Sequence, residues 1–316
     1  MRNVIRLSFI LPAVFFCFCC ATCKVDGIKK AYKTKHVVLI VVDGARYSET
    51  WGDSTRFRIP FQNTELLAEG CMLSDFRNNG FTWTSSGHTA LSTGIYESLD
   101  NGGNQFPSYP SFMQYWRKFT GAAQEKAWVI TSKDKLYVLS NTANTEFQSK
   151  WMPRYDCGIN GPFSGYRDDS VTTQKVISTL STYHPDLLLI NFREPDYSGH
   201  SGNWANYLTG IITTDQYISQ IWNALQSDPY YAGTTTLMVT NDHGRHLDSV
   251  ADGFRSHGDD CEGCRHIGFC VAGPDFKKNF TSSVRYEQID VPRTIAELMA
   301  FPMATGTGKV MVEIMR

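Results

Sequence analysis

The sequence lacks a strong excess of charge of either sign. Its 30 Lys and Arg residues nearly balance its 31 Asp and Glu residues, which leaves a formal net charge of −1. Proteins that bind nucleic acid through its phosphates need a basic surface, so we expect no nucleic acid polymer as a partner. The chain also lacks internal repeats and low-complexity segments, and 42% of its 316 residues are hydrophobic. One folded domain over residues 24–316 is therefore expected.

The apolar run near the start of the chain is too short for an ordinary membrane-spanning helix. Arg2 and Arg6 form a basic start before apolar residues 7–20, whereas a span needs about 20 apolar residues. This pattern indicates a secretory signal peptide over residues 1–23 and predicts export to the periplasm, the cell surface or the medium. The "CATC" of residues 20–23 is alternatively a loose lipoprotein leader, with Cys23 carrying a lipid anchor.

A second CxxC motif is missing. Five cysteines follow the leader, which is an odd number for an exported chain: Cys71, Cys157, Cys261, Cys264 and Cys270. The "CEGC" of residues 261–264 fits a short disulfide loop or half of a zinc site. Without a second CxxC, the disulfide is the expected interpretation.

Strand-like and helix-like segments alternate through the rest of the chain. Apolar strands are predicted over residues 36–42, 127–131, 186–191, 235–240 and 266–273. Helices are predicted over residues 110–119, 168–183, 206–227 and 290–299. Strands this apolar are buried on both faces, as in a parallel sheet that helices cover. The predicted fold is α/β, with a central, mostly parallel sheet flanked by helices on both faces.

Polar side chains gather where these strands end. Six Asp and His residues follow a predicted strand or lie in the loop before the next one: Asp43, Asp196, His200, Asp242, His243 and His257. Ligands of open α/β sheets bind beyond the carboxyl ends of the strands, so these side chains are expected at one edge. Burying Asp242 beside His243 is costly without a partner. Three carboxylates and three imidazoles can hold two zinc-like ions if a hydroxyl adds one more ligand.

A nucleophile is expected on a neighbouring helix start. Two metal ions suit a reaction at a phosphoryl centre, and "TWTSSGHTALSTG" over residues 82–94 begins a helix-like segment. A helix N-terminus presents amide donors to an anion. Thr84 is the candidate nucleophile, and Thr82 and Ser85 are alternatives.

The order of these motifs resembles the alkaline phosphatase superfamily, including its nucleotide pyrophosphatase/phosphodiesterase and bacterial alkaline phosphatase branches. The resemblance is carried by "DxxxH" at residues 196–200, "DH" at 242–243, "HG" at 257–258 and the tail at 289–308. It implies one metal site at Asp196, His200 and His257. It implies a second at Asp43, Asp242 and His243, with Thr84 as a further ligand. His266 is an alternative to His257. Zinc is expected, although manganese or iron also suits such sites.

Two other branches of this superfamily fit less well. Sulfatases carry a C/S-x-P-x-R motif, where this sequence has Thr84, Ser86 and His88. Phosphomutases carry a Ser nucleophile and a large inserted domain, for which the interval between Thr84 and Asp196 leaves little room. We therefore expect a small or minimal cap.

Substrate-binding residues are also implied by the resemblance. "TSKDKL" at residues 131–136 is similar to the "S-x-K-x-R" element of monoester-specific phosphatases, with Lys135 in place of Arg. Alternation along a strand would point Lys133 and Lys135 to the same side. Asn104 is similar to an asparagine that donates to a phosphoryl oxygen, and Asn101 is the alternative.

These residues together predict a hydrolase that acts on a small phosphate ester through a phospho-threonine intermediate, with phosphate monoesters as the preferred substrates. One alternative is a phosphodiesterase or nucleotide pyrophosphatase, with Phe81, Trp83 or Tyr155 stacking on a base. Another is an exported zinc-binding protein without catalytic activity.

Overall fold

The computed structural model describes residues 31–316. The predicted leader and Cys23 lie outside the described residues. Within residues 31–316, no helix combines the length and apolar character that a membrane crossing requires.

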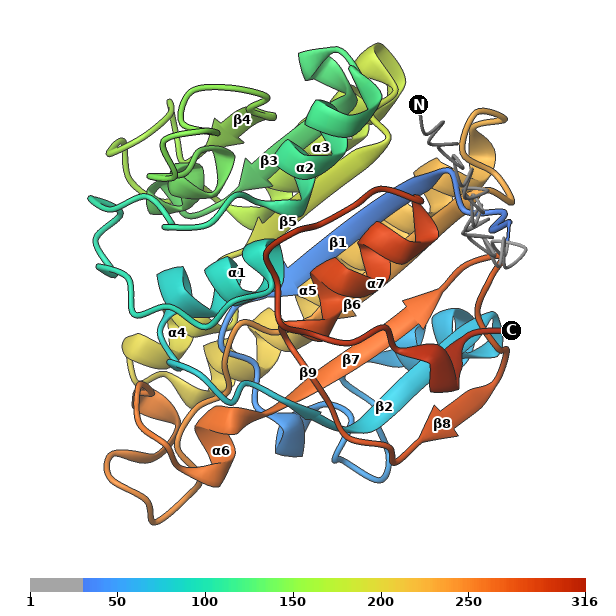
Figure 1. Ribbon diagram of the computed structural model, residues 1–316. Coiled ribbons are helices and arrows are strands. Elements are labelled where there is room, and N and C mark those ends of the chain that lie inside the picture. Colours follow the sequence, from blue (N-terminus) through green and yellow to red (C-terminus); the bar gives the residue numbers. More distant parts are fainter. Residues whose placement is uncertain (1–30) are drawn as a thin grey trace, which may run out of the picture. The chain divides into compact units, whose positions relative to one another are not determined.

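A nine-stranded sheet forms the centre of the described chain (Figure 1). Its path runs β4-β3-β5-β1-β6-β7-β2-β8, and β9 pairs with β2. In chain order the strands are β1 (His36–Val42), β2 (Gly70–Arg77), β3 (Ala127–Thr131), β4 (Arg154–Cys157), β5 (Leu187–Phe192), β6 (Thr235–Thr240), β7 (His266–Ala272), β8 (Phe280–Ser282) and β9 (Tyr286–Glu287). All five predicted strands are present, and β2, β4, β8 and β9 are additional.

The sheet is mostly parallel, as predicted. Strands β4, β3, β5, β1 and β6 pair in parallel. Only β7 reverses direction within this sheet, because it pairs antiparallel with both β6 and β2. The carboxyl ends of β1, β3, β5 and β6 consequently lie at one edge, where the predicted site residues follow them.

Helices cover both faces of the sheet (Figure 1). Helices α1 (Thr84–Thr93), α2 (Phe112–Thr120) and α7 (Asp290–Leu298) pack on one face, and α3 (Asp169–Tyr183) and α5 (Trp204–Ser227) on the other. A short helix, α4 (Asp196–His200), follows β5. Another short helix, α6 (Glu262–Arg265), directly precedes β7. The predicted α/β architecture with helices on both faces is confirmed.

Alternation along β1 explains why its sequence is apolar throughout. Val37, Leu39 and Val41 contribute to the core under α2 and α7. Val38 and Ile40 contribute to the core under α3 and α5. Successive side chains of a strand point to opposite faces of the sheet, so a strand covered by helices on both faces needs hydrophobic residues at every position.

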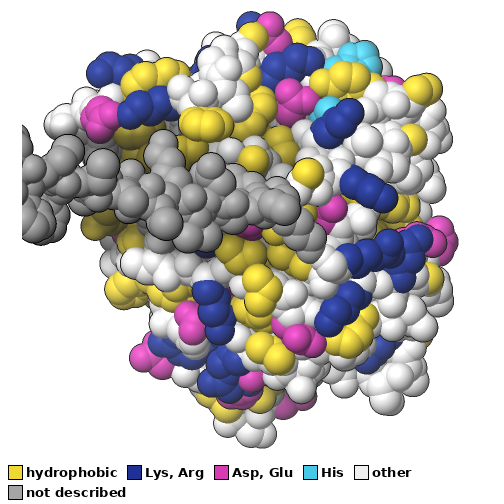
Figure 2. Space-filling model, turned by 45° about the vertical axis from the view of Figure 1, so that its right-hand side comes forward, with side chains coloured by type: hydrophobic (Ala, Val, Ile, Leu, Met, Phe, Trp, Pro, Cys, Tyr) yellow, Lys and Arg dark blue, Asp and Glu magenta, His cyan; other side chains and the backbone are white. Residues whose placement is uncertain are grey.

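Charged side chains of both signs are interspersed on the face drawn in Figure 2. The five cysteines of the described residues are free thiols. The expected disulfide between Cys261 and Cys264 is therefore not formed. Their sulfur atoms instead lie beside the side chains of His246 and Asp259.

Candidate active site

One cavity of about 480 Å³ opens at the carboxyl edge of the sheet. Six of the predicted site residues line it: Thr84, Lys133, Lys135, Asp196, His200 and His257. Asp43, Asp242 and His243 are fully buried beneath them. The structure thus brings together nine of the ten predicted residues, which come from segments more than 150 residues apart.

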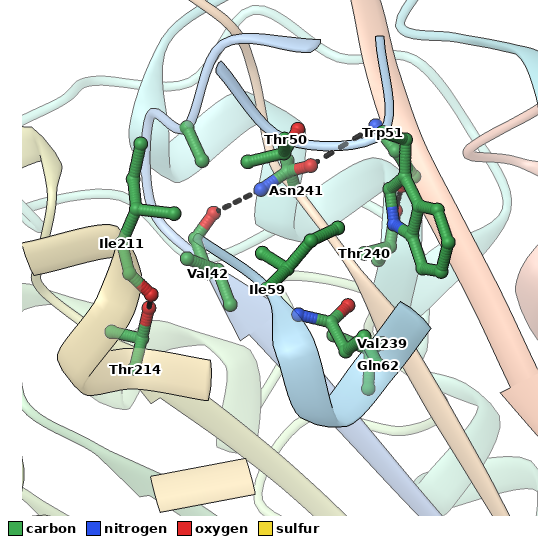
Figure 3. A pocket seen from close by; sticks show the side chains of 12 residues that line it. Val42, Thr50, Trp51, Ile59, Gln62, Ile211, Thr214, Val239, Thr240 and Asn241 are labelled. Atoms are coloured by element: carbon green, nitrogen blue, oxygen red, sulfur yellow. Dashed lines mark hydrogen bonds between the residues drawn. The ribbon is translucent and has the colours of Figure 1, made fainter. Parts of the chain in front are cut away.

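Hydrogen bonds between buried side chains and the backbone connect the end of β1 with the residues that follow β6. The Asn241 side chain donates to the Val42 carbonyl at 2.8 Å and accepts from the Gly268 amide at 3.0 Å (Figure 3). The side-chain amide of Gln288 donates to the Asp242 backbone carbonyl at 2.6 Å. The two Asn241 bonds satisfy buried polar atoms of the small cavity in Figure 3, and Val42 and Asn241 immediately precede Asp43 and Asp242 in the chain.

The first candidate metal group contains Asp43, Asp242 and His243. His243 Nε2 lies 3.2 Å from Asp242 Oδ2 and 3.5 Å from Asp43 Oδ1. Its Nδ1 donates to the Gly244 carbonyl at 2.8 Å. This bond leaves the Nε2 lone pair facing the carboxylates, which is the orientation of a metal-binding histidine.

The second candidate metal group contains Asp196, His257 and the same His243. Asp196 Oδ1 lies 3.5 Å from His257 Nε2 and 3.4 Å from His200 Nε2. His257 Nδ1 donates to the Thr82 carbonyl at 2.7 Å, so its Nε2 also faces the site. The rings of His243 and His257 stack with centroids 3.7 Å apart, which joins the two groups.

The chemistry of these groups fits divalent cations. Asp43 Oδ1 and Asp242 Oδ2 are buried oxygens that accept no hydrogen bond of good geometry, although Lys133 Nζ lies 2.9 Å from Asp43 Oδ1. A buried carboxylate oxygen without a donor is costly unless a cation lies nearby. Carboxylate oxygens and imidazole nitrogens are ligands that zinc, manganese and iron accept.

The pKa shifts report the crowding of negative charge. Burial and the neighbouring Asp242 raise the pKa of Asp43 to about 7. Burial also opposes ionisation of Asp196, but the Lys133 ammonium beside it holds the pKa of this carboxyl well below its usual range. Burial, followed by the neighbouring His243, lowers the pKa of His257 to about 2. Burial also lowers the pKa of His243, so His243 and His257 stay neutral and able to bind a metal.

Thr84 is the candidate nucleophile that faces this site. Its hydroxyl lies at the first residue of α1, 3.3 Å from Lys133 Nζ and 3.5 Å from His243 Nε2. Thr82 instead donates to the Asp259 carbonyl at 2.8 Å. Neither Thr82 nor Ser85 lines the cavity.

Asn101 lies in the cavity, and Asn104 does not. Asn101 Oδ1 accepts from the Ser85 amide at 3.0 Å and from Lys135 Nζ at 3.1 Å. Asn104 is exposed and donates to Asp100 at 2.8 Å. A turn through Gly103, whose φ is +82°, directs Asn104 away from the site. The alternative residue, Asn101, therefore takes the position expected for Asn104.

Both predicted lysines are buried in the cavity rather than solvated. Strand alternation does not bring the two lysines together, because β3 ends at Thr131. Lys133 directly precedes a 3₁₀ helix over Asp134–Ser140, and Lys135 lies in its first turn. Burial, with the nearby Lys133 charge, lowers the pKa of Lys135 to about 8. The carboxylates Asp196 and Asp43 outweigh burial at Lys133 and raise its pKa.

Sequence reasoning missed three supporting residues. Arg245 is fully buried and pairs with Asp196 Oδ1. His88 lies 3.2 Å from Asp242 Oδ2, and Asn191 donates to Asp43 Oδ2 at 3.1 Å. Arg245 follows His243 by two residues, and that proximity was the available signal. His266, the alternative to His257, stacks on Tyr47 and contacts Ser74 outside the cavity.

A model of the metalloenzyme superfamily matches residues 35–302. The 2,3-bisphosphoglycerate-independent phosphoglycerate mutase of Nitrosococcus oceani is 33% identical over 72 residues, which are 23% of this chain and 13% of that protein. The same enzyme of Onchocerca volvulus is 27% identical over 145 residues, covering 44% of this chain and 26% of that protein. The chain therefore spans about a quarter or less of these curated relatives.

Two solved structures show the same fold at low sequence identity. Murine ectonucleotide pyrophosphatase/phosphodiesterase 5 superposes with a TM-score of 0.63 and 15% identity, covering 89% of this chain and all of that one. The phosphonate monoester hydrolase of Agrobacterium radiobacter superposes with a TM-score of 0.65 and 12% identity, covering 88% of this chain and 76% of that one. The resemblance of the sequence to alkaline-phosphatase-like proteins is confirmed.

Proposed function

The chain belongs to the metalloenzyme superfamily, and on that premise we propose that it is a phosphoric ester hydrolase that forms a phospho-threonine at Thr84 and prefers monoesters. One observation carries the proposal. The Thr84 hydroxyl shares a cavity with two buried lysines and lies against both candidate metal groups.

The protein residues have separable roles in this reaction. Asp43, Asp242 and His243 would hold one divalent cation, and Asp196, His200 and His257 a second. When bound, such cations supply Lewis-acid stabilisation of charge at a phosphoryl group. Thr84 Oγ1 releases its proton to solvent water and forms a bond to phosphorus while the bond to the departing oxygen breaks, and the departing alkoxide takes up a proton from water to leave as the alcohol. Water then cleaves the phospho-threonine and releases inorganic phosphate.

Lys133 supports this attack from within the cavity. Its ammonium lies 3.3 Å from Thr84 Oγ1, where a positive charge favours the alkoxide over the hydroxyl. Thr84 is also the first residue of α1, and a helix N-terminus favours an anion nearby. Thr84 thus meets its two requirements, which are activation and an anion-binding surface.

The monoester preference rests on the number of cationic groups. A monoester is a dianion with three non-bridging oxygens, whereas a diester carries one charge and a second substituent. Lys133 and Lys135 both line the cavity, and Lys135 is held there by Asn101. Two ammonium groups match the dianion better than the monoanion.

Phosphodiester hydrolysis is the second candidate function. Exposed aromatic rings near the site support it: Tyr197 lines the cavity, and Trp83 lies with its ring centroid 5.6 Å from that of His257. Such rings could stack on a base or another flat substituent. Tyr155 lies instead against Tyr137, and neither ring lines the cavity.

The test is the ratio of kcat/KM for p-nitrophenyl phosphate to that for bis-p-nitrophenyl phosphate, measured on zinc-loaded protein from Lys24 onward. We expect the monoester to be preferred and Lys135→Ala to reduce its kcat/KM by about 10- to 100-fold, as for loss of one charged hydrogen bond. The exposed Lys150→Ala is the matched control. A diester preference that is insensitive to Lys135 would support the second function. No turnover of either ester by metal-loaded protein would overturn both.

Export is a further part of the proposal, because residues 1–23 have the pattern of a leader. Fractionation of cells that produce the full chain, with Cys23→Ser as the variant, tests it. Loss of membrane association in the variant would support a lipid anchor, and a cytoplasmic protein would contradict export.

A further inference from the structure

Four side chains of metal-binding type meet outside the candidate active site. Their ligand atoms lie within 4.8 Å of one another: His246, Asp259, Cys261 and Cys264. None of the four lines the active-site cavity. They come from the segment between β6 and β7, and Cys261 immediately precedes the short helix α6.

The orientation of His246 is that of a metal ligand. Its Nδ1 lies 3.0 Å from Asp252 Oδ1 and donates to that carboxylate. Metal-binding histidines commonly donate their second ring nitrogen to a carboxylate, which fixes the tautomer. The Nε2 atom, which carries the lone pair, is then directed at the cluster.

The pairing of His246 with Asp259 calls for a cation. His246 Nε2 is buried without a hydrogen bond of good geometry, yet it lies 3.1 Å from Asp259 Oδ2. A lone pair and a carboxylate oxygen repel each other at this distance unless a positive charge lies between them. Two thiols in the same cluster favour a soft divalent metal over a proton for that position.

We propose that His246, Asp259, Cys261 and Cys264 bind a structural Zn²⁺ ion. Zinc prefers four ligands in a tetrahedron and takes thiolate, imidazole and carboxylate together. The two cysteines have the C-x-x-C spacing of many zinc sites, and both are free thiols. A histidine from an earlier loop and an aspartate two residues before Cys261 replace the second CxxC that the sequence lacks.

The surrounding backbone is built for close approach. The Gly244 amide donates to the Cys264 carbonyl at 2.8 Å. A Cβ atom on Gly244 would lie 2.0 Å from the Gly263 carbonyl oxygen, and one on Gly263 would lie 2.4 Å from that of Arg245. Only glycines allow the two segments to lie this close, so the four ligands are held together by packing as well as by any ion.

The zinc ion would stabilise the loop that carries His257. The His246 amide donates to the Ser256 carbonyl at 3.1 Å, one residue before His257. A metal ion that links His246 to residues 259–264 would therefore hold both ends of the segment that contains His257. Loop closure by a metal stabilises the folded state by restricting the unfolded chain.

The test compares metal content and cobalt spectra of the full chain with those of the double variant Cys261→Ser/Cys264→Ser. Metal analysis after gel filtration should show one equivalent less in the variant, and Cys157→Ser, which alters another buried thiol, should lose none. Cobalt-loaded protein should show a thiolate-to-cobalt charge-transfer band in the near ultraviolet. No cysteine lies among the candidate active-site ligands, so the band reports this site alone and needs no enzyme activity.

Further variants separate the outcomes. Asp242→Asn, in the active site, should keep the charge-transfer band, and Asp259→Asn should weaken it. Equal metal content in the wild type and the double variant, or absence of the band in cobalt-loaded wild type, would overturn the proposal. So would a disulfide between Cys261 and Cys264 in protein alkylated without reduction.

Discussion

The ammonium nitrogen of Lys133 lies 3.3 Å from the hydroxyl oxygen of Thr84, deep under the carboxyl edge of the sheet. The same nitrogen lies 2.7 Å from Asp196 Oδ2. Lys133 therefore links the candidate nucleophile to a candidate metal ligand through one buried positive charge. Its contacts connect residues that follow β3 and β5 with the start of α1.

Thr84→Ala should abolish phosphoryl transfer without loss of metal. The substitution removes the attacking oxygen but none of the Asp and His ligands, so turnover should fall by on the order of a thousandfold or more. Thr84→Ser, which keeps a hydroxyl, should retain measurable turnover. Metal analysis and ester hydrolysis on the same samples check this. Unchanged turnover in Thr84→Ala would remove Thr84 from its role.

Asp242→Asn should weaken metal binding. The Asp242 carboxylate is fully buried beside His243. An asparagine amide offers a metal one neutral oxygen, whereas the carboxylate offers two oxygens that share a negative charge. Competition with a chelator should extract metal from this variant at a lower chelator concentration than from the wild type. Asp215→Asn is the matched control, because Asp215 is also buried but accepts from Phe61 and Gln62 away from the site. Equal effects of both substitutions would indicate general destabilisation.

Monoester hydrolysis should depend on the protonation of Lys135. Its pKa is lowered to about 8, so the ammonium is present below that pH and is lost as the pH rises through it. The kcat/KM for a monoester, which reports the free enzyme, should decline above about pH 8. Lys135→Arg carries a charge that does not titrate in this range, and its profile should lack that decline. An identical profile in both proteins would show that Lys135 does not face the substrate.

The sequence was most informative where a hydrophobic strand stopped at a polar residue. Asp43, Asp196 and Asp242 were predicted because the carboxyl ends of parallel strands share an edge. Strand β2 was missed because Ser74 and Asp75 interrupt its apolar run and a register shift occurs between Leu73 and Phe76. The antiparallel direction of β7 could not be predicted either, because a strand buried on both faces is apolar throughout whichever way it runs in the sheet.

Residues that act through side-chain contacts were harder to predict. Arg245 and His88 contact Asp196 and Asp242 only after distant segments pack, although each lies within four residues of a predicted site residue. The turn through Gly103 decides between Asn101 and Asn104, and both asparagines stand in the same "NGGN". The partners of "CEGC" were hidden for a related reason, because His246 lies 15 residues earlier in the chain.

Arg245→Met should destabilise the fold. The guanidinium pairs with Asp196 and donates to the carbonyls of Phe254 and Arg255, so it fastens the loop before His257. Breaking a buried ion pair from one side costs about 3–5 kcal/mol. Urea unfolding of chelated protein should show a loss of this size, whereas the exposed Arg154→Met should change stability little. A loss confined to metal-loaded protein would mean that Arg245 acts through the ligands alone.

Asn101→Ala and Asn104→Ala should have different effects on catalysis. Asn101 accepts from the Ser85 amide and from Lys135, so its loss frees the lysine and removes a polar group beside the nucleophile. We expect kcat/KM for a monoester to fall about 10-fold or more, as for one lost hydrogen bond to a charged group. Asn104 is exposed and donates to Asp100, and its removal should leave turnover within about twofold. The two asparagines are three residues apart, so each variant is the other's control. A larger loss in Asn104→Ala would mean that the turn closes over the substrate and brings Asn104 into the cavity.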